Sequence, residues 1–124
     1  MVRKYAMTGA AIALLAVIFG AFGAHMLKET LSEDDLKTFE TGVRYQMYHG
    51  LGILLVALLA DRFGSGKSML WAGRLLLLGV ILFSGSLYGL SLTGLAFFGP
   101  ITPLGGVSLI AGWLCLILAI RRPE

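Results

Sequence analysis

The segment LWAGRLLLLGVILFSGSLYGLSL, Leu70–Leu92, contains a single charged residue, Arg74. A helix needs about 20 mostly apolar residues to cross the hydrocarbon core of a bilayer, and this segment is long enough. Further apolar segments lie at residues 5–24, 48–60 and 103–120. We therefore predict an all-α fold, an integral membrane four-helix bundle that forms a single domain over residues 1–124.

The composition supports a membrane protein and argues against several other classes. Hydrophobic residues make up 57% of the chain and charged residues 14%, whereas a soluble domain has roughly 25% charged residues. The net charge is +3, but the basic residues lie beside apolar segments, so lipid explains them better than nucleic acid. The single cysteine, Cys115, allows no internal disulfide and no CxxC redox pair.

The charged residues also predict an orientation. One side of the predicted bundle holds the basic residues Arg3, Lys4, Arg62, Lys67, Arg74, Arg121 and Arg122. The other side holds Lys28, Lys37 and Arg44 beside the acidic residues Glu29, Glu33, Asp34, Asp35 and Glu40. The positive-inside rule then predicts that both termini are cytoplasmic. The first apolar segment exceeds the roughly 7–15 residues of a signal-peptide core, so we interpret it as a retained helix.

Residues 33–47 form an amphipathic helical segment before the short second span. Ser32 and Asp35 resemble a capping box, which marks a helix start. Leu36, Phe39 and Val43 share one helical face. This segment is expected to lie on the outer interface or to run straight into the second span.

Small residues occur at the spacing that close helix packing needs. The first span has Ala16, Gly20 and Ala24, and the third span has Gly85 and Gly89. Such stripes allow two helices to approach closely in lipid. We interpret them as packing seams within the bundle, with a dimer face as the alternative.

Polar residues from every predicted span gather at the outer level of the membrane. We call them the outer polar cluster: His25, Arg44, Tyr45, Gln46, Tyr48, His49, Ser84, Ser86, Tyr88 and Thr102. Polar groups within spans are costly, so their convergence at one depth predicts a pocket or a polar network. Separate explanations remain open: Tyr45 and Tyr48 as an interfacial aromatic belt, and Ser84 and Ser86 bonded to their own helix. Thr102 can cap the last span. Trp113 is interpreted as a packing residue.

The sequence indicates no catalytic chemistry. It contains no nucleophile–base set, Walker loop or Rossmann motif, and no carboxylate within the spans of the kind that proton-coupled transporters use. His25 and His49 can in principle bind haem or a metal, but two histidines without a third ligand are weak evidence for zinc. We therefore expect a protein that is not an enzyme, with no catalytic residues and no metal ligands, and the sequence identifies no cofactor.

The same residues carry a resemblance to a known family. The segments that match it are GAFGAH, FETGVRYQMYHGLGILL, GVILFSGSLYGL and GPITPLGGVSLIAGW. The chain resembles the small four-helix membrane proteins called domain of unknown function 423, which are related to the eukaryotic transmembrane protein 256. The resemblance implies an integral protein of the bacterial inner membrane, with an organelle as the alternative, and it implies no activity. The motif residues include all members of the outer polar cluster together with Pro103.

Three functional hypotheses follow. In the first, a non-enzymatic membrane protein uses the outer polar cluster to bind a lipid head group, a small ligand or a partner helix. In the second, the chain is a structural or assembly subunit of a membrane complex, and the cluster only holds the bundle together. In the third, His25 and His49 serve a haem or metal redox protein. The partners expected are membrane lipid, a small ligand, a membrane protein or a second copy of the chain, and not nucleic acid.

Overall fold

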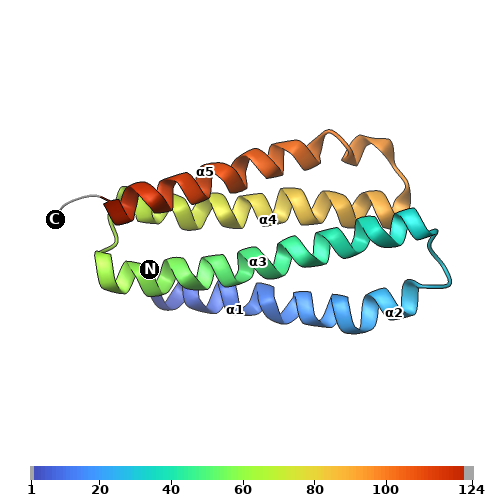
Figure 1. Cartoon of the computed structure of the whole chain (residues 1–124), viewed down its shortest axis with the longest axis horizontal. Helices are drawn as coiled ribbons and strands as arrows, with labels where there is room; N and C mark the ends of the chain where they lie inside the picture. The colour runs from blue at the N-terminus through green and yellow to red at the C-terminus, as the bar shows by residue number, and fades with distance from the viewer. Residues whose placement is uncertain (1, 122–124) are drawn as a thin grey trace.

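The computed structural model describes residues 2–121 and is helical, with no strand in this range (Figure 1). Its elements are α1 (Val2–Ile18), the π-helical turn η1 (Phe19–Gly23), α2 (Ala24–Leu27), α3 (Glu33–Phe63), α4 (Lys67–Thr93), the 3-10 turn η2 (Ala96–Phe98) and α5 (Ile101–Arg121). Four helical stretches are long and apolar enough to cross a membrane: Val2–Leu27, Glu33–Phe63, Lys67–Thr93 and Ala96–Arg121. The predicted all-α membrane bundle is confirmed. Arg122, used for the orientation prediction, lies outside the described residues.

Helix α3 joins the amphipathic segment and the second span into one helix of 31 residues. It begins where predicted, because the Ser32 side chain accepts a hydrogen bond from the Asp35 backbone N–H at 3.1 Å. The acidic residues of its first turn suit the positive end of the helix dipole. Helix α3 ends at Gly64, whose φ of +94° is unfavourable for residues with a side chain. The second span is therefore the C-terminal part of a longer helix.

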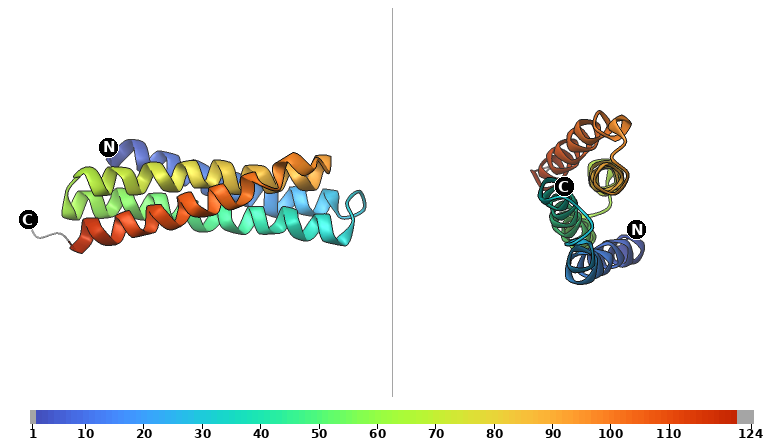
Figure 2. Two further views of the ribbon diagram at one scale, coloured as in Figure 1. Left: turned by 90° about the horizontal axis from the view of Figure 1, so that it is seen from above. Right: turned by 90° about the vertical axis from the view of Figure 1, so that its right-hand side faces the viewer.

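The helices pack in the order α1, α3, α4, α5, each mainly against its neighbours in that order. The end-on view in Figure 2 shows α1 and α5 at opposite ends of this arrangement. Both chain ends and the α3–α4 turn lie at one end of the bundle, and the α2–α3 and α4–α5 connections lie at the other (Figure 1). The bundle is therefore open: α1 and α5 do not pack against each other.

Close backbone approaches explain several glycines. A Cβ atom on Gly9 of α1 would lie 2.6 Å from the carbonyl oxygen of Gly50 in α3. A Cβ atom on Gly105 of α5 would lie 2.4 Å from the backbone nitrogen of Phe83 in α4. These distances are too short for any side chain, so glycine sets the separation of both helix pairs.

The predicted small-residue seams have different outcomes. Ala16 is buried, and a Cβ atom on Gly20 would contact Val43 of α3 at 3.2 Å, as expected for a seam within the bundle. The side chain of Ala24 lies outside the part that the structure describes. The Gly85–Gly89 pair does not form a seam between helices of this chain, because a Cβ atom on Gly85 would meet nothing within 4 Å, and one on Gly89 would meet the Phe98 ring of η2 at 2.7 Å. The alternative of a dimer face at this pair stays a prediction.

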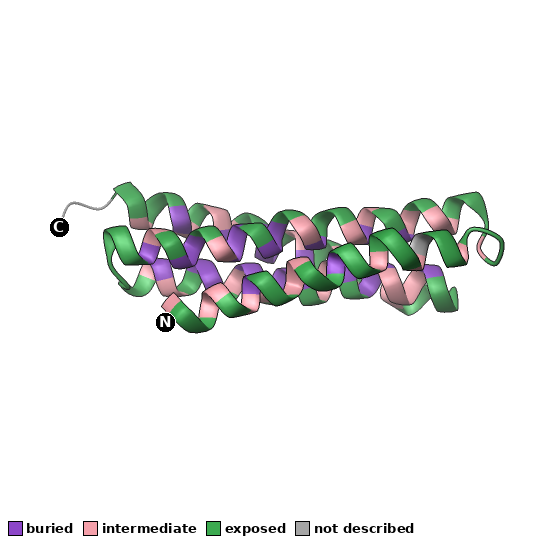
Figure 3. Cartoon of the chain, turned by 90° about the horizontal axis from the view of Figure 1, so that it is seen from below, coloured by how far each residue is buried: buried purple, intermediate pink, exposed green. Residues whose placement is uncertain are grey.

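The apolar core lies where α3, α4 and α5 face one another. Its buried members are Ile53, Val56, Ala60, Met69, Ala72, Leu76, Val80, Leu109 and Leu116. Figure 3 shows this buried strip between the helices and exposed residues along their outer faces. Many of these exposed side chains are large and apolar, such as Met7, Leu58 and Ile110, as expected for surfaces that face lipid.

Candidate functional site

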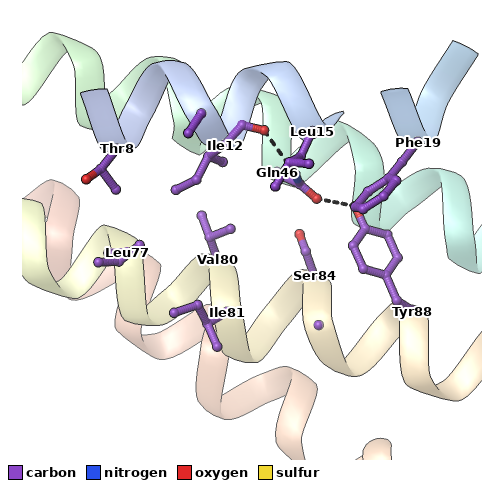
Figure 4. Close-up of a pocket in the computed structure, with 12 residues that line it drawn as sticks. Thr8, Ile12, Leu15, Phe19, Gln46, Leu77, Val80, Ile81, Ser84 and Tyr88 are labelled. Carbon is purple, nitrogen blue, oxygen red and sulfur yellow. Dashed lines mark hydrogen bonds between the residues drawn. The ribbon is translucent and has the colours of Figure 1, made fainter. Parts of the chain in front are cut away.

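A buried amide in α3 connects three helices. Gln46 is 5% exposed, and its Nε2 donates to the carbonyl oxygen of Ile12 in α1 at 3.0 Å. Its Oε1 accepts a hydrogen bond of 2.5 Å from the hydroxyl of Tyr88 in α4 (Figure 4). Both ends of the amide are therefore used by neighbouring helices.

A second contact brings α5 to α3. The indole Nε1 of Trp113 donates to His49 Nε2 at 3.0 Å, and His49 Nδ1 lies 2.8 Å from the carbonyl oxygen of Tyr45. An indole nitrogen can only donate, so Nε2 must be the acceptor and the ring hydrogen must lie on Nδ1. The Trp113 ring also covers Gly52, where a Cβ atom would lie 3.2 Å from the indole.

The role of Trp113 is larger than the sequence indicated. It packs, as expected, but it also supplies the hydrogen bond between α5 and α3. The available signal was the indole N–H itself, which seeks an acceptor when it is removed from water. The sequence could not show which acceptor it would reach.

The hydroxyl groups of α4 join it to both neighbours. Ser84 donates to the carbonyl oxygen of Gly42 in α3 at 2.7 Å, so its bond is not to its own helix. Ser86 bonds its own helix at Phe83 and also contacts the Thr102 hydroxyl of α5 at 2.6 Å. Thr102 is not the helix cap that the sequence predicted, because α5 already begins at Ile101. Its hydroxyl bonds between helices instead.

Ser108 of α5 was not predicted as part of any site. Its hydroxyl donates to the carbonyl oxygen of Leu75 in α4 at 2.7 Å. We call the following interhelical hydrogen-bonding side chains the polar network: Gln46, His49, Ser84, Ser86, Tyr88, Thr102, Ser108 and Trp113. Tyr5 forms a separate bond, from its hydroxyl to the carbonyl oxygen of Leu70 in α4 at 3.5 Å. Within residues 2–121, every buried side-chain nitrogen or oxygen atom has a hydrogen-bond partner.

The other members of the outer polar cluster lie at the surface. Tyr45 and Tyr48 are 38% and 53% exposed, and their rings lie 5.7 Å apart on α3. Arg44 is exposed beside them. His25 is exposed in α2, next to a shallow hollow that it shares with Met26, Lys28 and Glu29. The structure therefore divides the predicted cluster into the buried and half-buried residues of the network and a separate set of surface residues.

The described residues contain no group of three or more histidine, cysteine or acidic side chains suited to hold a metal ion. Both ring nitrogens of His49 are already engaged in hydrogen bonds. Haem or metal ligation by His49 would require breaking one of them.

A groove of about 540 Å³ lies between α1 and α4, with Gln46 of α3 at its floor (Figure 4). Its walls are mostly apolar. They are formed by Thr8, Ala11, Ile12 and Leu15 of α1, by Phe19 of η1, and by Leu77, Val80, Ile81, Ser84, Gly85 and Tyr88 of α4. No sequence pattern indicated this groove, because it depends on the angle between two helices that are far apart along the chain.

Residues 19–106 match the model of the family described as Protein of unknown function (DUF423). The chain belongs to this family. The resemblance seen in the sequence is thus confirmed. Among similar proteins, the UPF0382 membrane protein YwdK of Bacillus subtilis is 47% identical over 117 residues, covering 94% of this chain and 95% of its own.

Other relatives extend this likeness over nearly the whole chain. The UPF0382 inner membrane protein YgdD of Escherichia coli is 42% identical over 123 residues, covering 98% of this chain and 93% of its own. A UPF0382 membrane protein of Staphylococcus epidermidis is 45% identical over 120 residues, covering 97% of both chains. No solved structure matches the chain. This DUF423 protein is an integral membrane protein of uncharacterised function.

Proposed function

We propose that this DUF423 protein is a structural or assembly subunit of a membrane complex and not an enzyme. One observation carries the proposal: every buried polar side-chain atom in residues 2–121 is bonded to a partner within the chain. A site for a polar ligand would be expected to offer a buried group without a partner. The polar network instead uses its groups to hold the helices together.

The physical environment strengthens this interpretation. In the hydrocarbon region no water is present to bond a polar group, so each one must find a partner in the protein. The network supplies such partners between α1 and α3, α3 and α4, α4 and α5, and α3 and α5. The result is a bundle held in one arrangement, which suits a part that other membrane components pack against.

The proposed location is the bacterial inner membrane, with both termini in the cytoplasm. Support comes from the end of the bundle that carries both chain ends and the α3–α4 turn (Figure 1). The basic residues Arg3, Lys4, Arg62, Lys67 and Arg121 belong to this end. A C-terminal fluorescent fusion should be bright and a periplasmic phosphatase fusion inactive; the opposite result contradicts the orientation.

The size of the native assembly tests the assembly role. Tagged protein, extracted from its own membranes in mild detergent, should migrate on native gels well above the 13.3 kDa chain. If wild-type protein migrates as a single chain, the assembly role is wrong.

The polar network is tested separately. The Trp113→Phe variant, which loses the N–H but keeps an aromatic ring over Gly52, should have a lower melting temperature.

The surface residues of α3 favour a second candidate, in which the exposed face binds a lipid head group, a small ligand or a partner helix. Arg44 offers a cation beside the exposed rings of Tyr45 and Tyr48. Arg44→Gln should then reduce the amount of lipid, small ligand or partner that co-purifies with the protein. It should leave the melting temperature unchanged. Under the assembly proposal, Arg44→Gln changes neither.

A further inference from the structure

Aromatic contacts mark both ends of the groove between α1 and α4, and the groove is open along its side. At the end near the chain termini, the Tyr5 ring occupies the space where Gly73 would carry a Cβ atom, and its hydroxyl lies 3.5 Å from the carbonyl oxygen of Leu70. At the other end, the rings of Phe19 and Tyr88 meet edge to face with centroids 5.5 Å apart. Between these contacts α1 and α4 are separated by the groove.

The length of the groove selects the kind of occupant. From Thr8 to Phe19 the α1 wall rises about 16 Å, at 1.5 Å per residue. A helix that crosses the membrane must cover about 30 Å, so a groove about 16 Å long accommodates only part of it. The hydrocarbon part of one leaflet is about 15 Å deep, which is close to the length of the groove. The groove begins one helical turn from Lys4 and reaches past the middle of the Val2–Leu27 stretch, so a flexible acyl chain from the leaflet nearest Lys4 can lie in it.

The lining also suits an apolar chain. Ile12, Leu15 and Ile81 form the walls, and the polar groups of Gln46 and Ser84 at the floor already have partners in the protein. Gly85 leaves one wall open, because a Cβ atom there would meet nothing within 4 Å. An occupant therefore gains apolar contact without a polar group to satisfy.

Two cations lie beside the Tyr5 end of the groove: Lys4 precedes Tyr5, and Arg74 follows Gly73, which the Tyr5 ring covers. At 100° per residue, Lys4 shares the helical face of Thr8 and Leu15, and Arg74 shares the face of Ile81. Both cations are exposed, and the Arg74 guanidinium lies 5.4 Å from the centre of the Trp71 ring. The groove thus has positive charge at one end, where a phosphate group of the adjoining leaflet would lie.

We propose that the α1–α4 groove holds one acyl chain of an anionic phospholipid whose phosphate group lies against Lys4 and Arg74. This site goes beyond the assembly role and does not depend on it. A single chain that binds the lipid supports the lipid site and contradicts the assembly role. A large assembly that does not bind the lipid supports the assembly role and contradicts the lipid site.

Native mass spectrometry in detergent tests the site, with phosphatidylglycerol as the probe and phosphatidylcholine of the same chain length for comparison. Wild-type protein should bind one phosphatidylglycerol more tightly than phosphatidylcholine. Lys4→Gln and Arg74→Gln should each weaken phosphatidylglycerol binding about fivefold and leave phosphatidylcholine binding unchanged. Equal binding of the two lipids by wild-type protein overturns the head-group assignment.

Filling the groove tests the acyl-chain site. Gly85→Leu should weaken binding of both lipids at least tenfold, because the new side chain occupies the open wall. Ala10→Leu is the matched control, since Ala10 is exposed on the other side of α1 and does not line the groove. If Gly85→Leu is less stable than the control, Ala11→Leu fills the groove from α1 and replaces it. Unchanged lipid binding in the groove-filling variant overturns the proposal. The proposal is also wrong if the wild-type protein forms a dimer without lipid and the groove-filling variant dissociates that dimer.

Discussion

Replacing Gln46 by leucine tests the polar network at its most connected residue. The change removes the bond from Nε2 to Ile12 and the bond that Oε1 accepts from Tyr88. The Ile12 carbonyl oxygen lies inside α1, so it still accepts a backbone hydrogen bond within that helix. The Tyr88 hydroxyl has no other partner among its hydrogen bonds in the described chain.

The magnitude follows from these two losses. An interhelical hydrogen bond in a membrane protein contributes about 0.6 kcal/mol on average and about 1.7 kcal/mol at most. A buried hydroxyl left without a partner costs about 1–3 kcal/mol. Leucine has nearly the volume of glutamine, so little cavity energy is added. Gln46→Leu should therefore lower the free energy of unfolding by about 2–4 kcal/mol.

The second variant, Tyr88→Phe, completes a double-mutant cycle. Combined with Gln46→Leu, it removes the stranded hydroxyl, so the double variant should be no less stable than Gln46→Leu alone. The coupling energy should be about 1 kcal/mol or more. Reversible unfolding in mixed micelles of dodecyl maltoside and sodium dodecyl sulfate, followed by circular dichroism, measures all four proteins. Additive effects, or a Gln46→Leu change below about 0.5 kcal/mol, would refute the reasoning.

Three further changes test other contacts. Trp113→Phe should reduce the free energy of unfolding by about 1–2 kcal/mol in the same micelle assay, because His49 Nε2 loses its donor; equal stability would argue against the α3–α5 bond. Gly50→Ala should lower the melting temperature strongly, since its Cβ atom would lie 2.9 Å from the backbone nitrogen of Ala13. Gly85→Ala should leave the melting temperature unchanged. Equal shifts in melting temperature for the two variants would contradict the close packing of α1 and α3 at Gly50. Ser108→Ala should cost about 0.6–1.7 kcal/mol, and a gain in stability would show that its bond to α4 is not favourable.

Local features of the sequence were sufficient to predict the helices. Length and hydropathy predict a membrane-spanning helix because the bilayer thickness is the same for every segment. The start of α3 was predicted because a cap depends on neighbours three residues apart, here Ser32 and Asp35. The gathering of polar residues at one membrane level rests on their distance along each span and stays a prediction.

Only the tertiary structure decided which polar groups meet and which surfaces stay open. Trp113 reaches His49, Thr102 reaches Ser86, and Gly85 faces a groove instead of a partner helix. A helix in lipid is apolar on most of its faces, so hydrophobic periodicity does not reveal which face turns toward a neighbour. The rotation and crossing of the helices follow from close glycine contacts such as Gly9 with Gly50, and those contacts join segments that are distant along the chain.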